Sequence, residues 1–118
     1  MRIRVLACVM IAAAGSLTAK INFMRDVKPI LENRCVRCHG SQNAMRGLRL
    51  DQKDRAMLAI VARKPDDSAI YNAAKSGFMP PGGPKLAPAE IETLRRWIAE
   101  GARWPRGVEL TAKNPFLP

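Results

Sequence analysis

Residues 35–39 read Cys-Val-Arg-Cys-His, and this stretch constrains the fold more than any other part of the chain. Two thiols three positions apart lie on one helical turn, and an imidazole follows the second thiol directly. A structural zinc site would need four Cys or His ligands, but Cys8 is the only other cysteine and His39 the sole histidine. A thioredoxin-like redox pair would need a βαβ pattern around the cysteines, and strand signals are weak here.

Covalent attachment of a haem is the interpretation that fits these residues without further partners. Cys35 and Cys38 can each add to one vinyl group of a single haem, and His39 can then reach the iron as proximal ligand. The motif therefore predicts one haem c with its iron, and a c-type cytochrome. Aromatic residues make up only 5% of the chain, so a buried flat cofactor would supply apolar surface that the side chains supply sparingly.

The first 19 residues have the pattern of a secretory signal peptide. Arg2 and Arg4 precede an apolar stretch from Val5 to Ala14, and small residues lead up to Ala19. The apolar run is shorter than the roughly 18 to 20 residues that cross a bilayer, so we expect cleavage and a periplasmic protein, with an uncleaved anchor as the alternative. Haem is joined to such motifs outside the cytoplasm, and cleavage would also remove Cys8.

The rest of the chain has room for one domain, which we place at residues 20–105, followed by an extended tail at 106–118. Asp26 is the expected N-cap of a helix that continues through Arg34 into the motif. A second helix is expected from Asp51 to Ala62, with Met57, Leu58 and Val61 facing inward. The tail is expected to pack on the domain as a strap rather than form a helix or strand.

Two further helices follow a break at Pro65. A short one should run from Ser68 through Lys75 and end at Gly77, and a proline-rich loop at 78–84 should separate it from the last helix. That last helix should begin near Pro88 and stop at Gly101. Ile91, Leu94 and Ile98 should share its buried face, with Trp97 beside them, and Glu92 and Arg96 should form an i,i+4 ion pair.

The iron needs a second axial ligand if the site is to be closed, and no second histidine exists. Met24 lies before the haem helix, Met45 is only six residues past His39, and Met57 fits an apolar helix face. Met79 is the best candidate, since Pro80 and Pro81 stiffen its loop. A His39/Met79 pair favours ferrous iron and suits electron transfer rather than enzymatic catalysis.

An ordered set of short motifs resembles the Planctomycete-type cytochrome c domain over roughly Ile21 to Pro105. The set comprises Phe23-x-x-Asp26-Val27-x-Pro29-Ile30-Leu31, CxxCHG, Gly47-Leu48-Arg49-Leu50-Asp51, Pro65-x-x-Ser68-x-Ile70-Tyr71, Met79-Pro80-Pro81 and Leu94-x-x-Trp97-Ile98-x-x-Gly101-Ala102-x-Trp104-Pro105. The resemblance implies an all-α, small class I-like cytochrome c fold of about four short helices around one covalently bound haem, with Met79 as distal ligand. Such domains usually have a glycine just before the Pro65 equivalent and a Ser or Thr cap before the last helix. Arg63-Lys64 and Ala87 stand there instead, so we expect two altered turns.

The predicted function is one-electron transfer in the periplasm. A haem c subunit of a larger dehydrogenase or oxidase complex is the alternative, and an open-iron haem enzyme or sensor is a weaker one. The net charge is +10, or +8 without the leader, which implies redox partners with acidic docking surfaces and allows contact with anionic membrane, while export argues against nucleic acid. Arg46 or Arg49 could pair with a haem propionate, with solvated arginines as the alternative.

Overall fold

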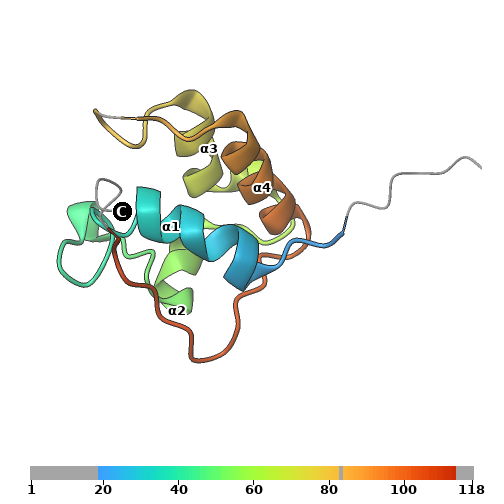
Figure 1. Ribbon diagram of the computed structural model, residues 1–118, viewed down its shortest axis with the longest axis horizontal. Helices are drawn as coiled ribbons and strands as arrows, with labels where there is room; N and C mark the ends of the chain where they lie inside the picture. Colours follow the sequence, from blue (N-terminus) through green and yellow to red (C-terminus); the bar gives the residue numbers. More distant parts are fainter. Residues whose placement is uncertain (1–18, 83, 114–118) are drawn as a thin grey trace, which may run out of the picture.

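The computed structural model describes residues 19–82 and 84–113, and within them all regular structure is helical. Four α-helices, α1 (Lys28–Arg34), α2 (Lys53–Ala56), α3 (Ala69–Ser76) and α4 (Pro88–Ala99), are joined by turns and loops (Figure 1). The predicted all-α fold of about four short helices is therefore confirmed. The predicted leader, apart from Ala19, lies outside the described residues. No helix in the described part of the chain combines the length and apolar character needed to cross a bilayer.

α1 is preceded by a wide π-helical turn, Phe23–Val27, whose N-cap is Asn22. The Asn22 side chain accepts a hydrogen bond from the Arg25 backbone N–H, at 2.9 Å. The prediction of Asp26 as N-cap was wrong, because Asp26 lies inside this turn and its carboxylate accepts from the Asn22 N–H instead. Pro29 has no N–H to donate, and its ring would crowd the carbonyl four residues back, so the wider turn relieves that conflict.

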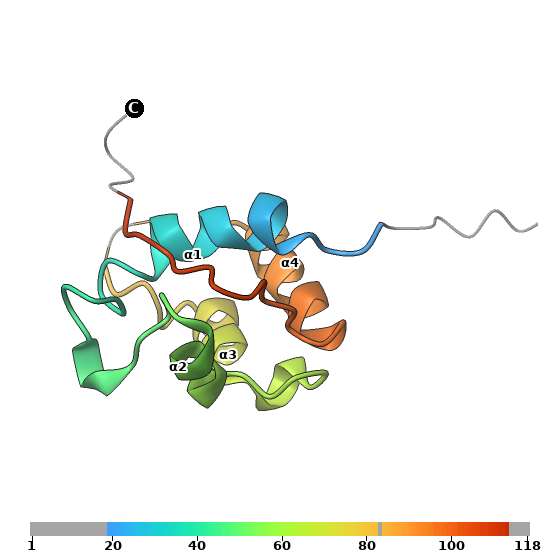
Figure 2. The same ribbon diagram turned by 90° about the horizontal axis from the view of Figure 1, so that it is seen from below.

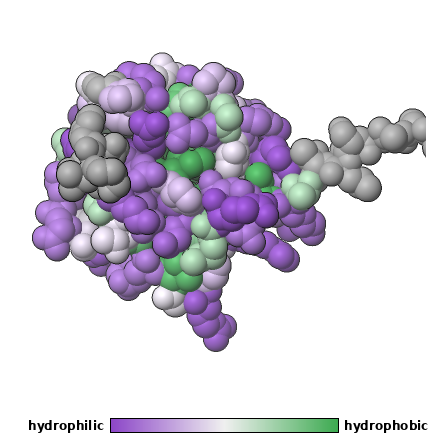
Figure 3. All heavy atoms as spheres, viewed as in Figure 1, coloured by the Kyte–Doolittle hydropathy of each residue, from purple (hydrophilic) through white to green (hydrophobic). Residues whose placement is uncertain are grey.

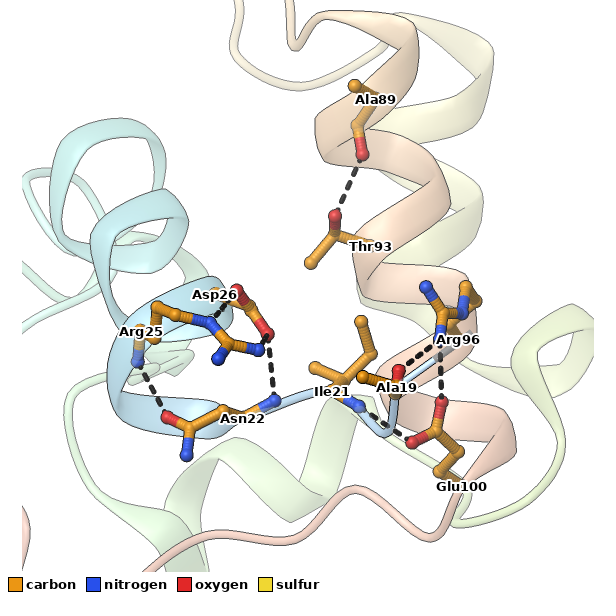
Figure 4. A network of polar contacts seen from close by, with 9 residues as sticks. All are labelled: Ala19, Ile21, Asn22, Arg25, Asp26, Ala89, Thr93, Arg96 and Glu100. Atoms are coloured by element: carbon orange, nitrogen blue, oxygen red, sulfur yellow. Dashed lines mark hydrogen bonds and ion pairs between the residues drawn. The ribbon is translucent and has the colours of Figure 1, made fainter. Parts of the chain in front are cut away.

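The segment that enters this turn is held against α4 (Figure 4). The Ile21 backbone N–H donates to Glu100 at 2.9 Å, and the Arg96 guanidinium donates to the Ala19 carbonyl at 2.7 Å. Arg96 also lies 3.8 Å from the Glu100 carboxylate. The chain entry and the end of α4 are thereby joined through two side chains.

These contacts explain why the predicted Glu92–Arg96 ion pair was wrong. Arg96 is turned toward Ala19 and Glu100, and Glu92 instead accepts two hydrogen bonds from Arg95, at 2.8 and 2.6 Å. Hydrogen bonding to Arg95 holds the pKa of Glu92 below its usual value. The periodicity of the helix allowed either partner, and the position of the entry segment selects between them.

The second predicted helix is shorter than its sequence pattern indicates. α2 ends at Ala56 and tightens into a 3-10 turn, Met57–Ala59, before the chain extends at Ile60. Leu58 is 85% exposed and Val61 is 43% exposed, so the prediction that they face inward was wrong. The buried residues are Ala56, Ala59 and Ile60, because the 3-10 turn rotates the helical face by one position.

The last two helices end and begin near the glycine and proline that predicted their boundaries. α3 ends at Gly77, which has the left-handed φ of +77° that a glycine accepts without strain. Pro88 occupies the first turn of α4. The two unusual positions are indeed altered: Arg63 has a positive φ of +70°, and Ala87, at the N-cap of α4, offers no side-chain acceptor. The Glu90 carboxylate still accepts from the Ala87 N–H at 2.9 Å.

An aromatic cluster fills the core where the entry turn meets α4. The ring centroids of Phe23 and Trp104 are 4.5 Å apart, and Phe23 and Trp97 are 5.8 Å apart. Each indole N–H also has a backbone acceptor: Trp97 donates to the Arg103 carbonyl and Trp104 to the Val108 carbonyl, both at 2.8 Å. The two tryptophans therefore add apolar area without leaving a buried donor unpaired.

The chain after Trp104 is a strap whose far end lies against α1 (Figure 2). The Leu110 N–H donates to the Asp51 carbonyl, and the Lys113 N–H donates to the Glu32 carbonyl. The buried Glu32 carboxylate accepts from the Thr111 N–H at 2.9 Å. The expected packed strap is present as far as Lys113, and residues 114–118 lie outside the described residues.

Glu32 is the anchor of this strap, because Lys28 and Lys113 also lie within 3.4 and 3.6 Å of its carboxylate. In the haem-loaded protein, Glu32→Ala should lower the free energy of unfolding by about 1–3 kcal/mol, since it leaves the Thr111 N–H without its acceptor. Glu32→Gln should lose less, because its carbonyl still accepts. Chemical denaturation followed by circular dichroism measures both, with the exposed Glu109→Ala as control. Equal stability of Glu32→Ala and the control would contradict this role.

Candidate functional site

A cavity of about 310 Å³ opens between the Cys35–His39 turn, α3, the loop at 78–81 and α4. Cys35, Cys38, His39 and Met79 all line it. These four residues were singled out from two separate parts of the sequence, and the structure brings them to one place.

The cysteine motif begins where α1 ends. The Cys35 N–H still bonds to the Leu31 carbonyl, but Cys35 has left helical geometry, and the N–H groups of Cys38 and His39 both bond to the Cys35 carbonyl. The motif is thus a compact turn after the helix rather than its continuation. Val36 within it is buried in the core, whereas the two cysteines and His39 line the cavity.

The loop after the motif folds back on it. The Leu50 N–H bonds to the His39 carbonyl at 2.6 Å, and the Met45 N–H bonds to the Cys38 carbonyl at 3.0 Å. Gly40 permits this path, since a Cβ there would lie 2.4 Å from the Val36 carbonyl oxygen. The backbone around His39 is therefore fixed from both sides, and the loop delivers Leu48 and Leu50 to the cavity wall.

The remaining wall is almost entirely apolar. α3 presents Ala69 and Ala73, one helical turn apart, together with Ile70 and Ala74. Leu86 and Leu94 close the far side, and Phe78, 69% exposed, stands at the rim. Sequence reasoning missed the contribution of α3, although its small residues at 69 and 73 are the signal of a helix face that leaves room. Tyr71, which ends the Pro65-x-x-Ser68-x-Ile70-Tyr71 motif, is buried but does not line this cavity.

The methionines of the described residues differ in whether they line the cavity. Met24 and Met45 are each 48% exposed, and Met57 packs against the core cluster away from the cavity. Met79 alone among them lines the cavity. The Met79 N–H bonds to the Ala73 carbonyl at 3.1 Å, so α3 fixes the backbone from which the thioether projects.

The electrostatics of the free thiol oppose thiolate chemistry. Desolvation raises the pKa of the Cys35 thiol to about 12, and the negative charge of Glu90 acts in the same direction. Cysteines that exchange disulfides need a lowered pKa, because the thiolate is the nucleophile. Both motif cysteines are free thiols, and Cys35 is placed for tethering rather than for redox exchange.

Two arginines line the cavity. Arg34, which sequence reasoning missed, directly precedes Cys35 and donates to Glu90 at 3.4 Å. Arg46, one of the two predicted propionate partners, lies at the cavity as well. Arg49, the other, does not: its guanidinium makes two hydrogen bonds to the buried Asp51, at 3.0 and 2.6 Å.

The residues present fit a haem. Two thiols and an imidazole share an apolar cavity with a thioether, and the buried His39 Nδ1 has no hydrogen-bond partner among the described residues. A buried imidazole nitrogen without a partner is uncommon in a core packed for itself. Apolar walls with a few convergent polar groups are the usual form of a cofactor site.

Comparison with protein families gave one match to this part of the chain. Residues 35–83 match the family model described as Planctomycete cytochrome C. This segment of the chain is similar to that family. Searches of curated proteins and of solved structures gave no significant match.

The matched segment runs from Cys35 to just past Met79 and the two prolines after it. The resemblance inferred from the ordered motifs is thereby confirmed. Similarity to a cytochrome c family implies covalently bound haem c with its iron. Cys35 and Cys38 would tether the group in this cavity, and His39 would ligate the iron.

Gly40 offers a direct test of the motif turn. Gly40→Ala should reduce the fraction of cytochrome that carries haem, because the new methyl group meets backbone at Val36 and overpacking of this kind costs about 1–3 kcal/mol. Ser41→Ala, at the adjacent exposed position, is the matched control. Haem content per polypeptide, from the pyridine haemochrome spectrum and intact mass, measures the effect. Equal loading of the two variants would show that the turn tolerates the Cβ.

Proposed function

We propose that this cytochrome is a periplasmic one-electron carrier whose iron is ligated by His39 and Met79. The observation that carries the proposal is that Met79, from the loop after α3, lines the same cavity as Cys35, Cys38 and His39. Export is supported by the leader pattern in residues 1–19 and by the site of haem attachment outside the cytoplasm.

Bound haem c supplies reversible one-electron exchange between ferric and ferrous iron. The chain contributes the tethers at Cys35 and Cys38, which hold the group in one orientation, and the walls from α3, Leu86 and Leu94, which keep water away. A thioether from Met79 favours the ferrous form and leaves no open position for oxygen or peroxide. Electron transfer of this kind requires no acid, base or nucleophile from the protein.

The strap supports a self-contained carrier over a subunit of a larger dehydrogenase or oxidase complex. Residues 106–118 were the segment through which a subunit could contact its complex, and as far as Lys113 this segment is engaged on the domain itself. An open-iron enzyme or sensor would require Met79 to be away from the iron.

Axial ligation is tested by removing the thioether. In holoprotein made with its leader in a host that assembles c-type cytochromes, Met79→Ala should become high-spin in the ferric state and lose the sulfur-to-iron charge-transfer band. The reduced variant should bind carbon monoxide at neutral pH, because the sixth position is open. Absorption and magnetic circular dichroism measure these changes.

Met57→Ala is the matched control, since Met57 is also partly buried but lies outside the cavity. It should keep the low-spin spectrum and exclude carbon monoxide. An unchanged low-spin spectrum in Met79→Ala would mean that another group holds the sixth position. Carbon monoxide binding by the unmodified protein would favour the open-iron alternative.

Charge supports acidic redox partners. Hydrophilic side chains cover most of the face in Figure 3, with small hydrophobic patches between them, and the chain without its leader still carries +8. Attraction between opposite charges speeds encounter and is screened by salt. Anionic membrane surfaces offer the same attraction.

The rate of electron exchange with an acidic redox protein should therefore fall with ionic strength, by about tenfold or more between low and high salt. Exchange with a basic redox protein should instead become faster as salt screens the repulsion. Stopped-flow spectroscopy of the holoprotein with each partner measures both trends. A rate that does not respond to salt with either partner would contradict electrostatic steering.

A further inference from the structure

Two positive side chains line the described part of the cavity, and they differ in whether a nearby acid offsets their charge. In the described ranges 19–82 and 84–113, Arg34 and Arg46 are the cations that line it. The Arg34 charge is offset, because its guanidinium donates to Glu90 at 3.4 Å. Arg46 forms no ion pair and no side-chain hydrogen bond with any described residue. One exposed, uncompensated positive charge therefore lies among the residues that line a mostly apolar site.

The backbone of Arg46 is held in a conformation that this residue type seldom adopts. Its φ is +56° and its ψ is +24°, and Gly47 after it has a φ of +72°. The left-handed region costs a non-glycine residue about 1–2 kcal/mol. Strain of this kind persists where surrounding structure fixes it, and it gathers at ligand-binding sites.

The surrounding hydrogen bonds do fix it. The Met45 N–H bonds to the Cys38 carbonyl at 3.0 Å, and the Gly47 N–H bonds to the Ala44 carbonyl at 2.8 Å. His39 and Ala44 also form a β-bridge. The position of Arg46 is thus tied directly to the turn that carries the haem tethers.

Arg49 shows what a structural arginine looks like in the same loop. Its guanidinium makes a two-point contact with the buried carboxylate of Asp51, and this contact raises the pKa of Arg49. The backbone carbonyl of Asp51 also accepts a hydrogen bond from the Leu110 N–H, which joins this segment to the strap. Arg49 therefore stabilises the fold, while Arg46 is left for a ligand.

We propose that Arg46 is a positioning residue of the cofactor site, and that its guanidinium binds a propionate carboxylate of haem c. A haem brings two carboxylates to a cavity whose described wall holds this unpaired cation. Guanidinium groups bind carboxylates through two parallel hydrogen bonds. The inference rests on the proposed function for the presence of haem, but it concerns a different residue and a different part of the cofactor.

Such a contact has two consequences for the loaded protein. It fixes the orientation of the propionate, and it keeps a positive charge close to the porphyrin. A nearby positive charge favours the electron-rich ferrous state. Arg46 should therefore raise the midpoint potential as well as hold the carboxylate.

The test compares Arg46→Gln and Arg46→Lys with Arg55→Gln in the holoprotein. Arg55 lies on α2, is exposed and does not line the cavity, so its variant controls for loss of one charge anywhere on the molecule. Resonance Raman spectroscopy reports hydrogen bonding to the propionates through their bending mode, and redox titration reports the midpoint potential.

Arg46→Gln should shift the propionate bending mode and lower the midpoint potential by more than Arg55→Gln does. Arg46→Lys should recover most of the potential, because it keeps the charge, but not the bending mode, because it loses the two-point contact. If Arg46→Gln does not retain haem, the bending mode of Arg46→Lys decides by the same criterion.

The proposal is overturned if haem-loaded Arg46 variants have the bending mode of the unmodified protein and a potential change no larger than that of Arg55→Gln. A shift produced by Arg34→Gln but not by Arg46→Gln would overturn it as well. Failure of the proposed function is distinguishable, since it would appear in the unmodified protein as carbon monoxide binding or as absence of covalent haem.

Discussion

The Cys35–His39 turn lies beside a cavity, and the arrangement of the helices around that cavity is the main feature of this small domain. A cavity of about 310 Å³ removes packing contacts from α3, α4 and the loop at 78–81 alike. The apolar side chains that line such a space are stabilised when an apolar group covers them. The helices therefore form a shell for a cofactor. Cys35 and Cys38 line the same cavity, so a group attached to them would also fill it.

Sequence patterns gave the parts of the shell that depend on local backbone chemistry. Gly77 and Pro88 mark the end of α3 and the start of α4 because φ preference and a missing N–H are properties of single residues. The grouping of Cys35, Cys38, His39 and Met79 followed from the small number of residues that can bind haem iron or its vinyl groups. The positions where a family glycine and a family cap are missing also became Arg63 with a positive φ and an N-cap, Ala87, without a side-chain acceptor.

Other features depend on contacts that are distant in sequence and could not be predicted from it. Leu58 points to solvent since a 3-10 turn shifts the register of α2. Arg96 does not pair with Glu92 because it donates to the Ala19 carbonyl, which is 77 residues away in the sequence. Arg34 was missed because nothing in its local pattern distinguishes a residue of a cavity wall from an exposed helix residue, whereas Ala69 and Ala73 of α3 did carry a signal in their small size. Arg46 and Arg49 lie three residues apart in one loop, and the local contact of Arg49 with Asp51, two residues further on, separates their roles.

The contact between Glu32 and the strap has a consequence for biosynthesis. The Thr111 N–H that satisfies the Glu32 carboxylate is 79 residues further along the chain. While the chain is made from its N-terminus, Lys28 is available to this acid four residues earlier, whereas Thr111 is added much later. The helix leading into Cys35 therefore gains its contact with the strap only after the chain has grown through residue 111.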